Sequence, residues 1–140
     1  MRMLGLDVGD RRIGVAMSDA LGLTAQPVTV IERRTLAKDA AAILALVDSH
    51  HVEGIVVGLP LTLRGAEGPQ AKKVTVFVEA LRRRVTIPIQ TADERLTTVQ
   101  GERTLIAMDV PRQKRKEVID RVAAQLILQH YLDTQRDEQA

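Results

Sequence analysis

Hydrophobic residues in the first part of the chain fall into three short runs separated by polar or turn-forming residues. Residues 3–9 form an apolar run that ends close to an acid and a glycine, and residues 13–19 form a second run after a short polar turn. Two such runs joined by a tight turn predict a β-hairpin. A third β-rich run, residues 28–32, follows Pro27, which suits the start of a further strand.

The remainder of the chain alternates helical and strand patterns. Thr35 is a suitable N-cap for the first helix, and residues 54–59 are a continuous apolar run, typical of a strand covered on both faces. The elements predicted after the first three strands are a helix over 36–49, a strand over 54–59, a helix over 69–84, a strand over 85–91, a helix from about 97 to 108, and a last helix from 114 or 117 to 132. The predicted fold class is therefore α/β, with a five-stranded mixed sheet that begins with three antiparallel strands and carries helices on its faces.

The composition is that of one globular domain. With 140 residues, of which 45% are hydrophobic and 27% charged, the chain is long enough to bury a core. We expect a single domain over residues 1–135 and a polar C-terminal tail over 136–140. The sequence has no apolar run of the roughly 20 residues that span a bilayer, no signal-peptide layout and no cysteine. These features predict a cytoplasmic protein with no membrane partner.

Basic residues are clustered, although the formal net charge is only +2. Such clusters can steer a phosphate backbone, and they are also common on solvated faces. Arginines 82–84 suit the negative end of the predicted helix, and we favour that interpretation for them. The two aromatic residues, Phe77 and Tyr131, are too few for recognition by base stacking, so a bound nucleic acid would be contacted through backbone and shape. The clusters are Arg33-Arg34, Arg82-Arg83-Arg84, and Arg112 with Lys114-Arg115-Lys116.

Asp7 is an acid inside the first apolar run. An ionised carboxylate beside buried strand residues is costly to desolvate unless a cation or a hydrogen-bond donor meets it. Gly9 follows two residues later and, having no side chain, lets a phosphate or a metal come close. The alternative interpretation is that Asp7 only begins the turn, because Asp is a common turn residue.

Two further acids occupy unusual positions for surface charges. Glu94, beside Asp93, follows the last predicted strand, and Asp120 lies at the edge of the apolar stripe of the last predicted helix. Hard divalent cations prefer oxygen ligands, and two such ions can stabilise the attacking and leaving oxygens of a phosphoryl displacement. The chain has no Gly-x-Ser-x-Gly elbow and no Walker A motif. The acids therefore point to metal-assisted phosphoryl chemistry.

Several short motifs, taken together in their order and spacing, resemble the YqgF (RuvX) family of Holliday junction resolvases, also described as pre-16S ribosomal RNA nucleases. The resemblance covers roughly residues 2–133 and implies a ribonuclease H-like fold. The motifs are Leu4-Gly5-Leu6-Asp7-Val8-Gly9 with Arg12-Ile13-Gly14-Val15-Ala16, Gly58-Leu59-Pro60, Asp93-Glu94-Arg95-Leu96-Thr97-Thr98, and Asp120 with Ala123-Ala124 and Ile127-Leu128.

The resemblance also implies roles for individual residues. It implies Asp7, Glu94 and Asp120 as the catalytic acids, which together hold Mg²⁺ or Mn²⁺. Asp93 is an additional or alternative ligand, because the sequence cannot separate it from its neighbour. Asp19 is interpreted instead as a structural turn acid. The residues expected to contact substrate phosphates are Gly9, Arg12, Arg95, Lys114, Arg115 and Lys116.

The predicted function is a metal-dependent endonuclease of nucleic acid. Maturation of the 5′ end of the 16S ribosomal RNA precursor is the favoured role, and Holliday junction resolution is the alternative. The expected partners are structured RNA or branched DNA, together with the ribosome or its precursors. The protein itself is expected to be a monomer or a homodimer.

Two other classes of function remain open. Asp7-Val8-Gly9 with Gly14 is similar to the first phosphate loop of actin- and sugar-kinase-like ATPases, which suggests an ATP-binding module. Those proteins need two such domains to enclose a nucleotide, and 140 residues supply one. The other class is a non-catalytic nucleic-acid-binding factor, for which clustered arginines suffice without a metal.

Overall fold

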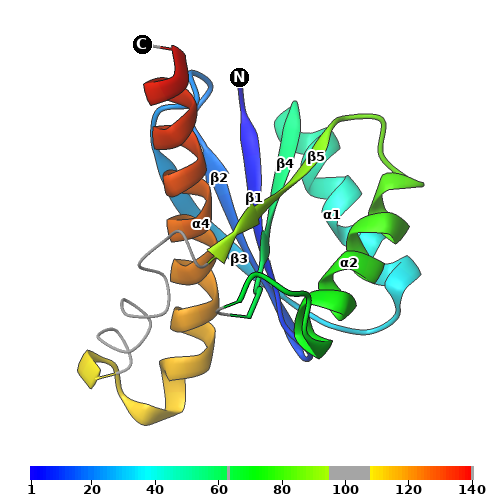
Figure 1. The fold of residues 1–140 in the computed structure, drawn as a ribbon, viewed down its shortest axis with the longest axis vertical. Coiled ribbons are helices and arrows are strands. Elements are labelled where there is room, and N and C mark those ends of the chain that lie inside the picture. The colour runs from blue at the N-terminus through cyan, green and yellow to red at the C-terminus, as the bar shows by residue number, and fades with distance from the viewer. Residues whose placement is uncertain (63, 95–107, 140) are drawn as a thin grey trace.

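The computed structural model describes residues 1–62, 64–94 and 108–139, apart from the side chains of residues 116, 117 and 139. Figure 1 shows the strands side by side between a long C-terminal helix and two shorter helices. The elements are β1 (Met3–Val8), β2 (Arg12–Ser18), β3 (Ala25–Glu32), α1 (Leu36–His50), β4 (Gly54–Leu59), α2 (Pro69–Arg82), β5 (Ile89–Asp93), the 3₁₀ turn η2 (Arg112–Lys114) and α4 (Arg115–Gln139).

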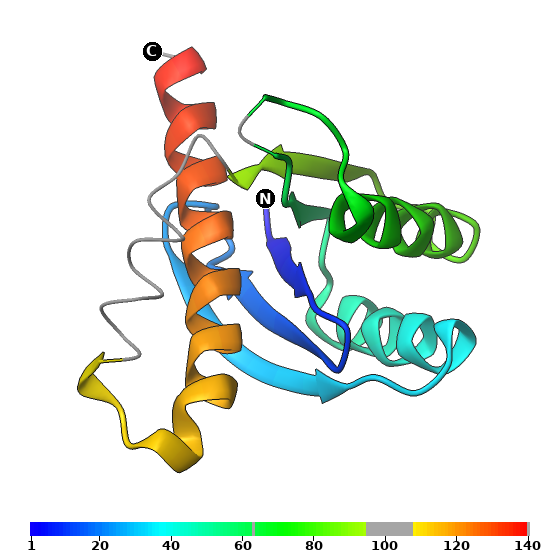
Figure 2. The same cartoon turned by 60° about the horizontal axis from the view of Figure 1, so that its bottom comes forward.

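The strands form one mixed five-stranded sheet in the order β3-β2-β1-β4-β5. β2 pairs with β1 and β3 in antiparallel fashion, whereas β4 pairs with β1 and β5 in parallel. Figure 2 shows α1 and α2 on one face of the sheet and α4 on the other. The predicted fold class is therefore confirmed. Because β1, β4 and β5 are parallel, their carboxyl ends meet at one edge, where ligands usually bind in sheets of this kind.

The face covered by α1 and α2 holds the larger hydrophobic core. Burying side chains of this size contributes about 1.5–3 kcal/mol each relative to leaving them exposed. Thr35 caps α1 as predicted, because its Oγ1 accepts a hydrogen bond from the Lys38 N–H at 3.1 Å. The strand residues of this core are Leu4, Leu6, Val8, Ile13, Val15, Met17, Ile55, Val57 and Ile89, and its main helix residues are Ala40, Ile43, Val47, Val74, Phe77, Val78 and Leu81.

The opposite face is covered by α4 and is lined by smaller residues. A Cβ atom at Gly5 would lie 2.7 Å from the Leu128 Cβ, so α4 packs directly against the backbone of β1. Although α4 runs for 25 residues, no helix in the described part of the chain is both long and apolar enough to cross a membrane. The core residues on this face are Met3, Ala16, Ala25, Val56, Ala123, Ala124, Ile127, Leu128 and Leu132.

Several element boundaries differ from the predicted ones. β5 spans Ile89–Asp93 rather than 85–91, because Val85 and Ile87 pack on the core without joining the β4 ladder. α2 ends at Arg82 and β3 begins at Ala25. The predicted helix from about 97 to 108 falls almost wholly outside the described residues.

The last helix extends further than its hydrophobic pattern indicated. The buried stripe ends at Leu132, but α4 continues to Gln139, so residues 136–139 of the predicted polar tail are helical. Polar contacts accompany these last turns, including an ion pair between Asp133 and Arg136 and a hydrogen bond from the Thr134 hydroxyl to the His130 carbonyl at 2.9 Å. A helix end held by polar contacts leaves no apolar periodicity to detect.

Candidate active site

A cleft of about 390 Å³ lies at the carboxyl ends of β1 and β4, between the start of α2 and the first turns of α4. Asp7, Glu94 and Asp120, the three predicted catalytic acids, all line this cleft although they are far apart in the sequence. The fold therefore brings the three carboxylates to one place. The other lining residues are Val8, Gly9, Asp10, Gly58, Pro60, Gln70 and Ile119.

The alternation of side chains along the strands places the strand acids on the α4 side of the sheet. Leu6 and Val8 belong to the core under α1 and α2, so Asp7, between them, faces α4. At the end of β5, Ala92 packs against the core on the α4 side, and Glu94 follows two residues later on the same side. The third acid belongs to α4 itself.

Gly14 of β2 allows α4 to approach the sheet next to Asp7. Gly14 is the cross-strand partner of Asp7. A Cβ atom at Gly14 would lie 1.9 Å from the carbonyl oxygen of Asp120, so the backbone of α4 fills the space that a side chain would need. The missing side chain at Gly14 thus determines how close Asp120 comes to Asp7.

Gly58 of β4 has the corresponding role for Glu94. A Cβ atom at Gly58 would lie 2.8 Å from the Glu94 Oε1 and 2.6 Å from the Ile127 Cδ1. The Glu94 side chain is therefore held over the β4 backbone, where the residue is only 5% exposed. The sequence carried a signal for this role, because a glycine inside an apolar strand often marks a close approach by another group.

The structure separates Asp93 from Glu94, which the sequence could not do. Asp93 is the last residue of β5, pairs with Leu59 in the ladder and does not line the cleft. Glu94 does line it. Successive residues of an extended strand point to opposite faces, so a metal held on the α4 side would meet Glu94 rather than Asp93.

The residues predicted to contact phosphates are placed differently from one another. Gly9 lines the cleft, but its N–H donates to the Arg12 carbonyl at 2.9 Å, so Gly9 offers space rather than this donor. Arg12 does not line the cleft, and its Nε donates to the Glu32 Oε1 at 2.9 Å across the β2–β3 pair. Arg95 lies outside the described residues.

The predicted basic loop lies where α4 begins. Lys114 is exposed in η2, and the Arg115 Nε donates to the Val110 carbonyl at 2.9 Å. The side chain of Lys116 lies outside the described part of the structure. These basic residues therefore lie in η2 and at the start of α4, shortly before Asp120.

Asp10 and Gln70 also line the cleft and were not predicted as site residues. Asp10 lies in the β1–β2 turn, and Gln70 lies at the start of α2, after the loop that follows β4. Both segments follow the carboxyl ends of parallel strands, a position that often carries ligand-binding residues. That position was the available signal, but it required the strand order.

Asp19 has a structural role away from the cleft, in agreement with its interpretation as a turn acid. Its Oδ1 accepts hydrogen bonds from the Leu23 N–H at 2.7 Å and the Thr24 N–H at 3.1 Å. The hydrogen bond from Thr24, followed by that from Leu23, holds the pKa of Asp19 below its ordinary value. This carboxylate therefore stabilises the β2–β3 turn in its ionised form.

Arg82 and Arg84 of the cluster at 82–84 make contacts at the end of α2, in agreement with our interpretation of the sequence. The Arg84 guanidinium donates to the Ala80 carbonyl at 2.9 Å, and Arg82 donates to the Ile89 carbonyl at 3.0 Å and pairs with Glu79. Cations at this position complement the negative end of the helix dipole.

The chemistry of the cleft suits a hard divalent cation. Among the residues that the structure describes, no group of three or more His, Cys, Asp or Glu side chains is arranged so that it could hold a metal ion by itself. Mg²⁺, however, usually keeps several waters and binds through one or two carboxylates and substrate phosphates. Carboxylates spread around a cleft of about 390 Å³ leave room for those additional ligands. The donor set therefore fits such an ion with substrate present.

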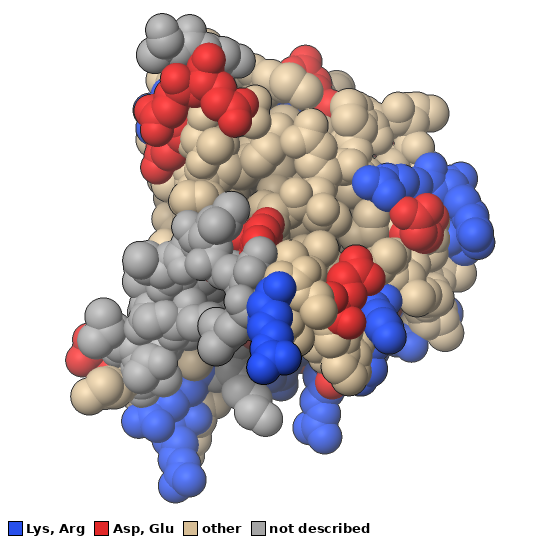
Figure 3. All heavy atoms as spheres, viewed as in Figure 1, with Lys and Arg blue, Asp and Glu red and all other residues tan. Residues whose placement is uncertain are grey.

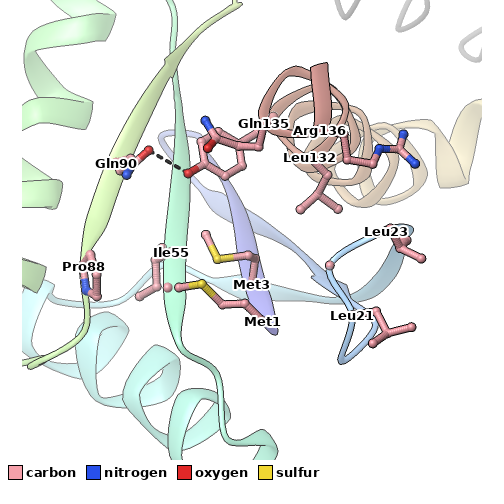
Figure 4. A pocket seen from close by; sticks show the side chains of 13 residues that line it. Met1, Met3, Leu21, Leu23, Ile55, Pro88, Gln90, Leu132, Gln135 and Arg136 are labelled. Carbon is pink, nitrogen blue, oxygen red and sulfur yellow. Dashed lines mark hydrogen bonds between the residues drawn. The ribbon is translucent and has the colours of Figure 1, made fainter. Parts of the chain in front are cut away.

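A second pocket, of about 370 Å³, lies at the opposite end of the sheet (Figure 4). It lies beside the starts of β1 and β4, and its lining includes Met1, Met3 and Leu132 but no acid. The Tyr131 hydroxyl donates to the Gln90 Oε1 at 2.8 Å beside it, and burial raises the pKa of Tyr131. The apolar lining lacks the carboxylates that metal-assisted chemistry needs.

Comparison with known proteins shows which family the chain resembles over nearly its whole length. The model of the family described as "RuvX: Holliday junction resolvase" matches residues 1–134. A protein of Halothermothrix orenii is 52% identical over 135 residues, which are 96% of each chain. A protein of Moorella thermoacetica is 53% identical over 133 residues, which are 95% of each chain. Both are named "Putative pre-16S rRNA nuclease".

Solved structures share the fold at low sequence identity. RuvC of Thermus thermophilus in complex with a Holliday junction substrate superposes with a TM-score of 0.62 at 15% identity, covering 98% of this chain and 96% of that one. The Holliday junction resolvase of fowlpox virus gives a TM-score of 0.54 at 8% identity, covering 96% and 99% of the two chains. At these identities the likeness shows a common ribonuclease H-like fold.

Proposed function

The chain belongs to the RuvX family, and on this basis we propose that it is a divalent-metal-dependent endonuclease that hydrolyses phosphodiester bonds of nucleic acid. Precursor 16S ribosomal RNA is the substrate that we favour, in line with the names of the relatives that are about half identical. The observation that carries the proposal is the convergence of Asp7, Glu94 and Asp120 on one cleft.

In this proposal, some residues of the cleft bind the metal and others contact the substrate phosphate. Asp7, Glu94 and Asp120 would supply carboxylate oxygens to Mg²⁺ or Mn²⁺, acting as ligands rather than as proton donors, with water and substrate phosphates supplying the remaining ligands. The bound cation supplies a Lewis acid that polarises the scissile phosphate and offsets the charge that develops on it. Gly9 leaves space for a phosphate beside Asp7, and the amide of Gln70, which also lines the cleft, can donate a hydrogen bond.

The decisive experiment compares cleavage of a precursor 16S rRNA 5′ fragment with cleavage of a four-way DNA junction, each in Mg²⁺, Mn²⁺ and EDTA. We expect the RNA to be cut only with metal, and Asp7→Asn to lower the rate about 100-fold, as the loss of one preorganised electrostatic group does, because it removes one charged ligand. Asp48→Asn is the matched control, since Asp48 is an exposed acid on α1 outside the cleft. It should cut at the parental rate.

Other outcomes redirect or overturn the proposal. Cutting of the junction alone would make the protein a resolvase, and two symmetric cuts would then call for a two-fold dimer. Full activity of Asp7→Asn would refute the assignment of the cleft. If neither substrate is cut with either metal, the protein is not an endonuclease for these substrates. That outcome would favour the alternative, a non-catalytic factor that binds nucleic acid.

A further inference from the structure

A basic groove of about 500 Å³ lies next to the catalytic cleft, between the β1–β2 turn, the start of α1 and one side of α2. Four residues line both the groove and the cleft, so the groove opens into the cleft. They are Val8, Gly9, Asp10 and Gln70. The remaining groove residues are Arg33, Arg34, Leu36, Lys73, Val74 and Val76.

The charges of the groove and the cleft are opposite. The cleft is lined by Asp7, Asp10, Glu94 and Asp120, and the groove brings three cations against a single acid, Asp10. An acidic cleft by itself repels a phosphate chain, so a polyanionic substrate needs cations close by. Figure 3 shows lysine and arginine side chains around the lower end of α2 as well as at the lower end of α4.

Arg33 forms the rigid base of this groove. Its Nε pairs with the buried Asp39 at 2.9 Å, its Nη1 donates to the Gly9 carbonyl at 2.8 Å, and its guanidinium lies 5.2 Å from the centroid of the Phe77 ring. Asp39 also accepts a hydrogen bond from the Arg34 N–H at 2.9 Å. The backbone that carries Arg34 is therefore held in place beside the β1–β2 turn.

Two cations remain available to a ligand. Arg34 is exposed, and within the described residues its guanidinium has no hydrogen-bond or ion-pair partner. Lys73 pairs with Asp10 at 3.2 Å, but both side chains are 62% exposed. An exposed pair of this kind is screened by solvent and contributes little, so a phosphate can replace Asp10 as the partner of Lys73.

We propose that this groove binds the phosphodiester backbone of the nucleic-acid segment that flanks the scissile bond, with Arg34 and Lys73 as its phosphate contacts. The inference rests on the proposed function, because it extends the same site. No aromatic residue lines the groove, so the contacts are to backbone rather than to stacked bases. The substrate then lies between this groove and the basic loop that precedes Asp120.

The test measures binding apart from catalysis. In the Asp7→Asn background and in EDTA, the affinity for a labelled precursor 16S rRNA 5′ fragment and for a four-way DNA junction is measured by fluorescence anisotropy between 50 and 200 mM salt. The affinity falls as salt rises, and losing one phosphate contact makes the slope of log K against log salt less negative by about 0.7–0.9. Arg34→Ala should therefore make the ratio of Kd values at the two salt concentrations about threefold smaller.

Two further variants keep the test specific. Lys73→Ala should make the slope less negative in the same way, whereas Arg83→Ala, which removes another exposed arginine beyond the end of α2 and outside the groove, should leave it unchanged. A change with RNA only, or with the junction only, assigns the groove to that substrate. An unchanged slope for Arg34→Ala, or an equal change for Arg83→Ala, would overturn the proposal.

The failure of this inference is distinguishable from the failure of the proposed function. If the wild type cuts with metal but Arg34→Ala has the parental salt slope, the proposed endonuclease activity is supported and the role of the groove is refuted. If nothing is cut but Arg34→Ala and Lys73→Ala make the slope less negative, the role of the groove is supported for a protein that binds nucleic acid without cleaving it.

Discussion

The two faces of the sheet are built from different kinds of residue. Under α1 and α2 the strands present leucine, isoleucine and valine, packed against helix residues such as Phe77 and Leu81. Under α4 they present glycine and alanine beside Met3 and Val56, with Asp7 at the sheet's carboxyl edge and Glu94 directly after β5. The same strands supply both faces because successive side chains alternate.

The difference shows how one small domain separates stability from chemistry. Large side chains hold α1 and α2 away from the sheet and supply most of the buried apolar surface. Small residues let α4 touch the strand backbone, so the position of Asp120 relative to Asp7 is set by direct contact at Gly14. We therefore expect mutations on the two faces to separate loss of stability from loss of activity.

The largest loss of stability is expected on the α1/α2 face. Leu81→Ala empties a fully buried site, and such truncations cost about 2–5 kcal/mol. Urea unfolding should show this loss, while the cleavage rate per folded molecule stays near the parental value because no cleft residue moves. A rate that falls in fully folded protein would contradict the separation of the two faces.

Gly14→Ala should damage both properties. The new Cβ would overlap the α4 backbone at Asp120, so the helix must move, at a cost of about 1–3 kcal/mol. Cleavage should fall more than for Leu81→Ala, as measured on folded protein. Gly68→Ala is the control, because among the described residues its Cβ would meet a flexible methyl group, that of Thr62 at 3.3 Å, and no backbone atom. Equal activity of the two glycine variants would refute the role of Gly14.

Gly58→Ala should cost less stability, about 1 kcal/mol, yet still impair cleavage. The atoms nearest to its new Cβ are the ends of the Ile127 and Glu94 side chains, which can rotate away where a backbone cannot. Because Glu94 must then leave its place, we expect kcat to fall and the metal concentration for half-maximal rate to rise. An unchanged metal requirement would show that Glu94 is not a ligand.

The smallest effect concerns Asp19, which belongs to neither face. Its pKa is lower in the folded protein than in the unfolded chain, so its contribution is present above the unfolded pKa and is lost as pH falls through the folded pKa. Asp19→Asn should therefore flatten the acid limb of the stability–pH curve, measured by unfolding at several pH values. Cleavage at neutral pH should not change. An identical acid limb in both proteins would contradict this linkage.

Much of the fold was readable from local patterns. The run at 54–59 and the Thr35 cap each agree with the structure, because a buried apolar strand and a polar cap are local signals. The strand predicted at 85–91 was misplaced, because Val85 is buried and Ile87 partly buried without either belonging to the ladder. Burial and strand pairing produce the same apolar pattern, so periodicity cannot separate them.

The sequence by itself indicated the α/β class, the three candidate acids and Gly9 after Asp7, since these follow from residue type, alternation and order along the chain. Only the tertiary structure decided that Glu94 rather than Asp93 enters the cleft, that Arg12 pairs with Glu32 instead of lining it, and that Arg34 and Lys73 lie beside it. These outcomes depend on strand order and on the distance between α4 and the sheet. Both are set by contacts between residues far apart in the chain, which no local pattern contains.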